Sequence, residues 1–253
     1  MTDIAAKARA FAALHKPGEP LILFNAWDPG SAKVVAEAGA AAIATGSWSV
    51  AAAAGFADAE SLPINLAIDN AARIVAAVDL PVTIDFEGGY ATDPQELGQH
   101  MAWLAKTGAI GCNFEDQVIG GEGIHDVADQ AARIAAARAV VGPDFFINAR
   151  TDIFLKARPD THDDAKIDAA LERARAYADA GGSGFFVPGL IDLRLLERVC
   201  SASPLPVNFM AFPGAPGAAE VANAGIARIS HGPHPFRIAM EALQAAAEAT
   251  YRS

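Results

Sequence analysis

The chain has 253 residues, 52% of them hydrophobic, and a formal net charge of −11 at pH 7. This length and apolar content are enough to bury a large core, which excludes a disordered chain. The acidic balance and the lack of any Lys/Arg run argue against a nucleic-acid partner. Cys112 and Cys200 form no CxxC or Cys/His cluster, so neither a disulfide framework nor a structural zinc site is expected.

The first segment, residues 1–15, mixes charged residues and alanines at helical spacing. It has no uninterrupted apolar stretch of the kind that a signal peptide needs, so we expect an amphipathic helix. No apolar run in the sequence approaches the length that crosses a bilayer. The protein is therefore expected to be cytoplasmic, with no membrane partner.

Strand-like apolar runs alternate with helix-like segments along the chain. The predicted strands are 21–25, 41–45, 81–86, 110–115, 145–149, 184–188, 206–210 and 226–230. The clearest predicted helices are 65–78, 93–107, 126–141, 163–180, 192–201 and 234–250. Since no linker divides this pattern, residues 1–253 are expected to form one domain.

Eight near-continuous apolar strands, each followed by a helical or Gly/Ala-rich crossover, predict a parallel sheet covered by helices. In a chain of this length, that pattern is typical of a (β/α)8 TIM-type barrel. The main alternative is a doubly wound open sheet. It is disfavoured because no GxGxxG follows the first strand and because eight units exceed what that fold usually needs.

Acidic residues end two neighbouring strands, at the end of the barrel where active sites lie. Asp85 and Glu87 end the third strand, and Glu115 ends the fourth. Positions two apart on a strand share a face, and crowded carboxylates repel unless a cation or a proton lies between them. Sets of oxygen ligands suit Mg²⁺ or Mn²⁺. The sequence therefore predicts a Mg²⁺ (or Mn²⁺) site formed by these three carboxylates.

Arg150 follows the apolar fifth strand and is expected at the barrel mouth. There it could clamp a carboxylate or a developing enolate by paired hydrogen bonds. The alternative for Arg150 is a structural ion pair with Glu115 or Asp152. Both alternatives place the guanidinium beside the predicted acidic site.

Four further residues are candidates for substrate binding. Backbone N–H groups of Gly46 and Ser47, after the second strand, would face an anion. Tyr90 lies in the loop beside the metal acids, and Asn208 lies on the seventh strand. Each of these signals is weak alone, but all four belong to loops or strand ends at the predicted barrel mouth.

A glycine-rich loop, VIGGEGIHD at 118–126, follows the fourth strand. Such a loop can close over a substrate and exclude water. Within it, His125 and Glu122 are candidates for a proton donor or acceptor. The alternative is that His125 caps the following helix or lies in solvent.

Four segments taken together resemble the isocitrate lyase/phosphoenolpyruvate mutase superfamily. They are 24–58, DFEGGYA at 85–91, NFEDQ at 113–117 and NARTD at 148–152. Their order and spacing carry the resemblance, which extends along nearly the whole chain. Members of this superfamily cleave or form a C–C or P–C bond next to a 2-oxo or 2-hydroxy acid, through a Mg²⁺-bound enolpyruvate-like intermediate.

The resemblance implies roles for individual residues. The three carboxylates named above would hold Mg²⁺ directly or through water, and Asp58 would belong to the same site as an outer or proton-handling group. Backbone N–H groups of Gly46, Ser47 and Trp48 would bind a pyruvyl-type carboxylate. Arg150 would stabilise the enolate.

The sequence also departs from the superfamily pattern. Glu87 replaces the usual Asp, and the loop at 118–126 lacks the Lys-x-Cys-Gly-His of the lyases. The sixth strand reads FFVPGL at 185–190, where the lyases present a Glu. The half of the site that would bind the metal and the enolate is thus kept, whereas the half that selects the leaving group is changed.

We therefore expect a Mg²⁺-dependent carbon–carbon lyase that acts on a small 2-oxo or 2-hydroxy carboxylic acid, for example by oxaloacetate-type decarboxylation. One alternative is a mutase or hydrolase at a P–C bond, and another is a non-catalytic barrel that binds small acids. The resemblance also implies a homo-oligomer, a dimer or tetramer, in which helix 234–250 packs on or is exchanged with a neighbouring subunit. Packing of this helix on its own barrel is the alternative.

Overall fold

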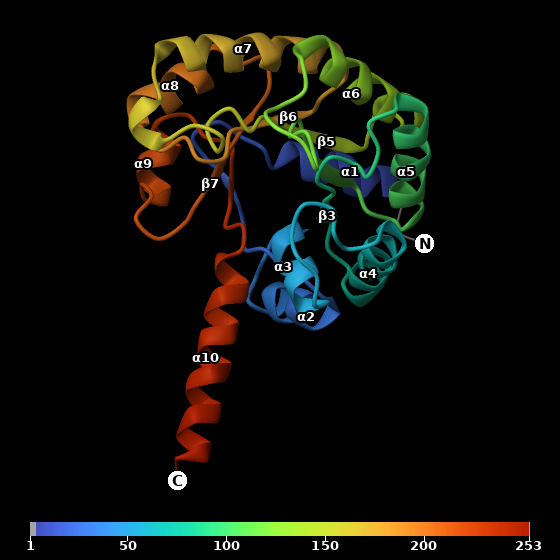
Figure 1. The fold of residues 1–253 in the computed structure, drawn as a ribbon, viewed down its shortest axis with the longest axis vertical. Coiled ribbons are helices and arrows are strands. Elements are labelled where there is room, and N and C mark those ends of the chain that lie inside the picture. Colours follow the sequence, from blue (N-terminus) through green and yellow to red (C-terminus); the bar gives the residue numbers. More distant parts are fainter. Residues whose placement is uncertain (1–3, 253) are drawn as a thin grey trace.

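Eight parallel strands form one sheet that curls into a nearly closed barrel in the computed structural model, which describes residues 4–252 (Figure 1). The strand order is β1-β8-β7-β6-β5-β4-β3-β2, and a single parallel bridge between Ala26 and Thr45 joins the two edges. This order confirms the TIM-type barrel and excludes the doubly wound alternative. The strands are β1 (Leu21–Leu23), β2 (Ile43–Ala44), β3 (Val82–Asp85), β4 (Gly111–Glu115), β5 (Phe146–Arg150), β6 (Gly184–Phe186), β7 (Val207–Met210) and β8 (Arg228–Ser230).

Helices connect the strands and cover the outside of most of the barrel. The six most clearly predicted helices are present, with ends within two residues of the predicted ones, and the helix expected in residues 1–15 is present over Ile4–Ala13. The helices are α1 (Ile4–Ala13), α2 (Pro29–Glu37), α3 (Ser47–Ala53), α4 (Ile64–Ala77), α5 (Pro94–Lys106), α6 (Val127–Val141), the 3-10 turn η1 (Pro159–Thr161), α7 (Asp164–Asp179), α8 (Leu193–Ala202), α9 (Ala218–Asn223) and α10 (His234–Tyr251). Within residues 4–252, none of them combines the length and apolarity needed to cross a membrane.

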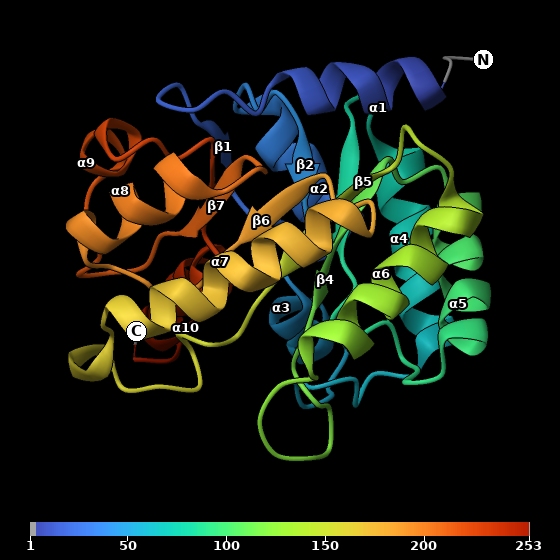
Figure 2. The ribbon, with the colours of Figure 1, turned by 90° about the horizontal axis from the view of Figure 1, so that it is seen from above.

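The amino-terminal end of the barrel is closed by α1, which lies across it in Figure 2. Phe11 of α1 is completely buried, and its ring meets that of Phe146 edge-on at 5.3 Å. His15, just after α1, stacks on the ring of Phe146 at 4.2 Å and meets the ring of Phe11 edge-on at 4.8 Å. We call this closed end of the barrel, formed by α1, His15 and the residues packed against them, the floor.

The last helix does not cover the barrel. Figure 1 shows α10 extending away from the body of the molecule, and Pro235 is its only buried residue. Its apolar residues Met240 and Leu243 are 39% and 63% exposed. On the barrel itself, Ile22 of β1 and the neighbouring Phe24 are 53% and 41% exposed. The structure therefore excludes packing of this helix along its own barrel and leaves two apolar surfaces open.

Candidate active site

A cavity of about 180 Å³ opens at the carboxyl ends of the strands, the end opposite the floor. We call this end the mouth. Strand ends and loops from most of the barrel contribute to the cavity wall, as the fold requires. The wall includes six of the predicted site residues: Gly46, Ser47, Trp48, Asp58, Asp85 and Arg150.

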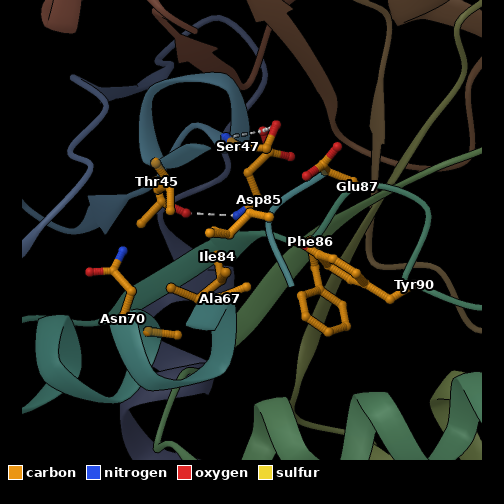
Figure 3. Close-up of a pocket in the computed structure, with 12 residues that line it drawn as sticks. Thr45, Ser47, Ala67, Asn70, Ile84, Asp85, Phe86, Glu87 and Tyr90 are labelled. Carbon is orange, nitrogen blue, oxygen red and sulfur yellow. Dashed lines mark hydrogen bonds between the residues drawn. The ribbon is translucent and has the colours of Figure 1, made fainter. Parts of the chain in front are cut away.

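Asp85, the last residue of β3, is held firmly at the cavity wall. Its Oδ2 accepts hydrogen bonds from both the backbone N–H and the hydroxyl of Ser47, each 2.9 Å long (Figure 3). Its own backbone N–H donates to the Thr45 hydroxyl at 2.9 Å. Ser47 begins α3, so its N–H is one of the unpaired donors of a helix start and favours a negative charge. The N–H that was predicted to bind substrate is therefore engaged by Asp85.

Glu87 does not continue the strand. It has a positive φ of 50°, so the alternation of faces ends at Asp85 and the strand argument for a shared face is wrong. Its Oε2 accepts a 2.8 Å hydrogen bond from the backbone N–H of Glu60. Burial, together with the nearby charges of Asp85 and Asp58, raises the pKa of Glu87 to about 8 against the opposing effect of that hydrogen bond.

Glu115 and Arg150 form a buried ion pair at the ends of β4 and β5. Arg150 Nη1 lies 2.7 Å from Glu115 Oε2, and its Nε and Nη2 donate to the two oxygens of Asp152 at 2.6 and 2.9 Å. Burial lowers the pKa of Arg150, but the charges of Glu115 and Asp152 outweigh it and the net shift is upward. The structural ion pairs considered for Arg150 are thus present, and the guanidinium still lines the cavity.

A buried network that the sequence did not reveal supports this arginine from behind. Asp116 accepts a 2.9 Å hydrogen bond from the backbone N–H of Asp152, and its other oxygen accepts from Tyr177 at 2.8 Å and Arg173 at 3.1 Å. Because Asp116 is completely buried, this charge needs the partners that α7 supplies. The network fixes Asp152, which in turn fixes Arg150.

Two loops beside Asp85, one containing residues 59–60 and the other residues 87–90, have strained backbone and are hydrogen-bonded to each other. All the described non-glycine residues with positive φ lie in them: Ala59, Glu60, Glu87 and Tyr90. The side chain of Glu60 accepts from the backbone N–H of Tyr90 at 2.8 Å, so the two loops are joined in both directions. Tyr90 also lines a small hollow of about 20 Å³ next to Asp85 and Glu87 (Figure 3). Such concentrated strain is typical of functional sites.

The three predicted magnesium ligands, Asp85, Glu87 and Glu115, are not arranged as a complete metal site. Among residues 4–252, no group of three His, Cys, Asp or Glu side chains is arranged to hold a metal ion. The donor chemistry nevertheless fits Mg²⁺, since every candidate ligand is a carboxylate and Asp85 lines the cavity. Burial raises the pKa of Glu87 and of Glu115, in an acidic cluster that a cation would relieve. Binding of Mg²⁺ by these three carboxylates, directly or through water, stays a prediction.

Four predicted residues line neither of the two cavities at the mouth: Glu115, which is paired with Arg150, and Glu122, His125 and Asn208. The backbone N–H of His125 donates a hydrogen bond to the Asp116 carbonyl at 2.7 Å. Partial burial lowers the pKa of the His125 ring. Asn208 is buried below the cavity, with its Oδ1 3.4 Å from the Ser230 hydroxyl.

Asn113 is a cavity residue that the sequence reading missed. It lines the wall and its Nδ2 donates to Asp85 Oδ1 at 3.4 Å. A signal for it was present, because Asn113 lies two positions before Glu115 on the same strand and so shares its face. Glu60 gave no such signal, since only the folded loops bring it against Glu87.

Comparison with known proteins agrees with this geometry. Residues 11–251 match the family model described as phosphoenolpyruvate phosphomutase. A protein of Burkholderia cenocepacia J2315 that carries the provisional name phosphonomutase is 51% identical; the match covers 98% of this chain and 100% of that one, with a TM-score of 0.95. The 2-methylisocitrate lyase of Escherichia coli K12 is 27% identical over 213 residues, 77% of this chain and 69% of that protein.

A phosphonopyruvate hydrolase in complex with oxalate and Mg²⁺ shares the fold at a TM-score of 0.85 and 20% identity, over 97% of this chain and 87% of that one. These findings show that the chain is a TIM-type barrel of the isocitrate lyase/phosphoenolpyruvate mutase superfamily, whose members are lyases and mutases. Within it, the chain belongs to the phosphoenolpyruvate phosphomutase family.

Proposed function

We propose that this protein is a Mg²⁺-dependent lyase that cleaves a C–C bond in a small 2-oxo or 2-hydroxy carboxylic acid. The observation that carries the proposal is that Asp85 and Arg150 line one small cavity at the barrel mouth. A carboxylate able to hold a cation and a fixed guanidinium are the two groups needed to bind an acid and stabilise negative charge that develops on it. The similarity to 2-methylisocitrate lyase supports carbon–carbon chemistry.

Arg150, Trp48 and Asp85 have roles that follow from their places in the cavity wall. Arg150, held by Asp152 and Glu115, would donate hydrogen bonds to the substrate carboxylate or to the oxygen that becomes an enolate. Trp48, in the first turn of α3, would offer a backbone N–H to the same anion. When bound at Asp85, with Glu87 and Glu115 contributing through water, Mg²⁺ would supply a Lewis acid for the substrate oxygens.

Asp58 is the candidate for handling a proton. It lines the cavity, and burial raises its pKa, with the charge of Asp85 acting in the same direction. A carboxyl group with a raised pKa can hold a proton closer to neutral pH than an exposed one. His125, the earlier candidate, lines neither cavity, so Asp58 is the better-placed of the two.

Phosphorus–carbon chemistry is the second candidate, because the matching family model is that of a phosphomutase. A phosphoryl group carries more negative charge than a carboxylate and normally meets several cationic groups. Among the described residues that line the cavity, Arg150 is the only cation, and the wall on its β6–β7 side is formed by Phe186 and Met210. This composition favours a leaving group with little charge, as in C–C cleavage.

The test is a substrate panel with two readouts. Purified protein is stripped of metal, resupplied with Mg²⁺, and incubated with 2-oxo and 2-hydroxy acids and with phosphonopyruvate. Pyruvate or another 2-oxo acid released only with Mg²⁺ would support the lyase, and free phosphate or phosphoenolpyruvate would support P–C chemistry. Tight Mg²⁺-dependent oxalate binding with no turnover on the whole panel would instead indicate a binding protein.

We also propose that the protein is a homo-oligomer in which subunits exchange α10. The apolar side chains of α10 and the exposed Ile22 and Phe24 are complementary surfaces that one chain alone leaves open. Ile22→Asp should therefore lower the molar mass in solution, measured by light scattering, towards that of a monomer. Val140→Asp is the matched control, since Val140 is similarly exposed at 48% but lies on α6. An unchanged mass for Ile22→Asp, or an equal loss in the control, would contradict the exchange.

A further inference from the structure

A completely buried arginine lies inside the barrel, below the cavity. Arg228, on β8, is the largest side chain among the fully buried ones. Its Nη2 donates to Asn113 Oδ1 on β4 at 3.0 Å. In the sheet, β8 pairs with β1 and β7 and β4 pairs with β3 and β5, so this contact crosses the barrel interior. A long charged side chain placed there is costly unless it has a specific task.

Asn113 joins Arg228 to the cavity. Its amide oxygen accepts from Arg228 and also from Asn148 Nδ2, at 2.8 Å. Its amide nitrogen donates to Asp85 Oδ1 at 3.4 Å. A guanidinium group has only donors, so the atom of Asn113 that faces Arg228 must be the oxygen. The amide nitrogen must then face Asp85.

Without Arg228, the opposite arrangement of the two amides would be open. Asn148 Oδ1 is buried and has no hydrogen-bond partner among residues 4–252. If both amides turned over, Asn113 could donate to that oxygen and present its own oxygen to Asp85. An oxygen facing a carboxylate is repulsive, so the turned-over pair would push the Asp85 side chain out of its position. Arg228 excludes this arrangement because it would face an amide nitrogen.

The positive charge of Arg228 also helps to hold Asp85 in place. Burial lowers the pKa of Arg228 to about 10, and the charge of Asp85 opposes that shift, so the guanidinium is protonated at neutral pH. Its Nε and Nη1 also have no hydrogen-bond partner in the described part of the chain. The positive charge below the cavity is thus not neutralised by a direct ion pair and adds to the field at Asp85.

We propose that Arg228 is a positioning residue: it fixes the amide of Asn113 so that Asn113 donates to Asp85 and holds this carboxylate in the orientation that binds a divalent cation and the substrate. The inference rests on the proposed function, because it assigns Asp85 to ligand binding. Arg228 itself does not line the cavity and touches no reacting group.

The test measures oxalate binding with and without Mg²⁺ by titration calorimetry, at a temperature where every variant is folded. Arg228→Met, which keeps the length and removes the donors, should weaken Mg²⁺-dependent oxalate binding about tenfold, as expected for losing a hydrogen bond to a charged group. Arg228→Lys restores a donor and should bind within about threefold of the wild type. The matched control is Arg138→Met, which removes a partly buried arginine whose described hydrogen bonds go to the loops below the barrel, including the carbonyl of Gly181 at 2.9 Å. It should lower the melting temperature and leave the affinity unchanged.

A double-mutant cycle separates positioning from a general loss of structure. Asn113→Leu should weaken binding on its own, and the Asn113→Leu/Arg228→Met pair should lose clearly less affinity than the sum of the two single losses, because only the effect of the Arg228 charge is then left to lose. Additive losses would mean that Arg228 does not act through Asn113 and would overturn the inference. If Arg228→Met does not fold, the same cycle with Arg228→Gln decides, since an amide offers both donor and acceptor and permits the turned-over arrangement.

The outcomes also separate this inference from the function on which it rests. Wild-type protein that shows no Mg²⁺-dependent oxalate binding would contradict the proposed function. Wild-type protein that binds, with Arg228→Met and Arg228→Gln binding equally well, would overturn the positioning role and leave the proposed function standing.

Discussion

The floor and the mouth of this barrel differ in composition: the floor is apolar, and the mouth is rich in carboxyl groups. At the floor, α1 brings Phe11 and neighbouring apolar side chains against Phe146, and this cluster has no described residue with strained backbone. At the mouth, carboxyl groups with raised pKa lie beside loops whose residues Glu60 and Glu87 have positive φ. The floor gains stability from burial, whereas the mouth keeps polar groups and strain that reduce it.

This difference indicates that stability and chemistry are placed at separate ends of the same strands. In a TIM-type barrel, the strand ends away from the active site are free to be packed for stability alone. Substitutions at the floor should therefore change the free energy of unfolding and not activity. Substitutions at the mouth should do the reverse, and the following predictions test that separation.

The largest effect is expected at Asp85. Asp85→Ala removes the carboxylate that lines the cavity and accepts from Ser47, and it should reduce Mg²⁺-dependent turnover about 10³-fold while the melting temperature stays within a few degrees. Steady-state kinetics and thermal unfolding of the same samples check this. Asp93→Ala is the matched control, because Asp93 caps α5 away from the cavity; it should cost about 1 kcal/mol of stability and leave turnover unchanged. Full activity of Asp85→Ala would mean that the metal site is elsewhere.

The largest effect at the floor is expected for Phe11. Phe11→Ala leaves a cavity in a completely buried position, so the free energy of unfolding should fall by about 3–5 kcal/mol. Turnover per folded molecule, measured below the melting transition, should equal that of the wild type. Ile4→Ala on the same helix is the control, because Ile4 is 52% exposed and its loss should cost less than about 0.5 kcal/mol. A drop in turnover for folded Phe11→Ala would show that the two ends are coupled.

The barrel could be predicted from sequence because its signal is spread over the whole chain. Eight apolar runs separated by helical segments define the fold even when each boundary is inexact. The predicted strands 21–25 and 184–188 shorten to Leu21–Leu23 and Gly184–Phe186, because an apolar run continues into the loop after the last ladder hydrogen bond. The apolar pattern of α10 could not show that this helix leaves the barrel, since a helix packed on its own barrel is equally apolar; only the family resemblance implied it.

The candidate site was predictable where a residue follows directly from a strand end. Asp85, Arg150 and the segment after β2 were found in this way, and the structure brings them to one cavity. The face argument failed at Glu87, because a backbone turn with positive φ replaces the strand there. Contacts between distant loops, such as that of Glu60 with Glu87, leave no local pattern in the sequence.

A smaller effect at the floor concerns acid stability. Burial, with the charge of Arg228 acting in the same direction, lowers the pKa of His15 from 6.5 to about 3. The unfolded chain thus takes up a proton below about pH 6.5, and the folded chain does so only near pH 3. Stability is therefore present above pH 6.5 and lost as the pH falls, by about 2 kcal/mol at pH 5.

The variant that isolates this effect is His15→Phe, which should keep the ring stack on Phe146 and remove the titrating group. Urea unfolding at pH 7 and pH 5 should show a difference about 2 kcal/mol smaller in His15→Phe than in the wild type. His162→Gln, at a histidine that bonds to the Phe154 carbonyl far from the floor, should keep the wild-type difference. An unchanged difference in His15→Phe would show that His15 is protonated in the folded state.

The smallest effect is expected at His125, in the loop over the mouth. His125→Ala keeps the backbone N–H that holds the loop to the Asp116 carbonyl, and the lost ring lines neither cavity. Its kcat/KM should therefore stay within about threefold of the wild type, whereas Asp58→Asn should lose about 10²-fold if Asp58 handles the proton. The two pH–rate profiles decide between the candidates. A loss of about 10²-fold in His125→Ala, with the disappearance of a limb near neutral pH, would mean that the loop closes and brings the ring to the substrate. Proton transfer would then depend on His125 in a mobile loop and not on Asp58 in the fixed wall of the cavity.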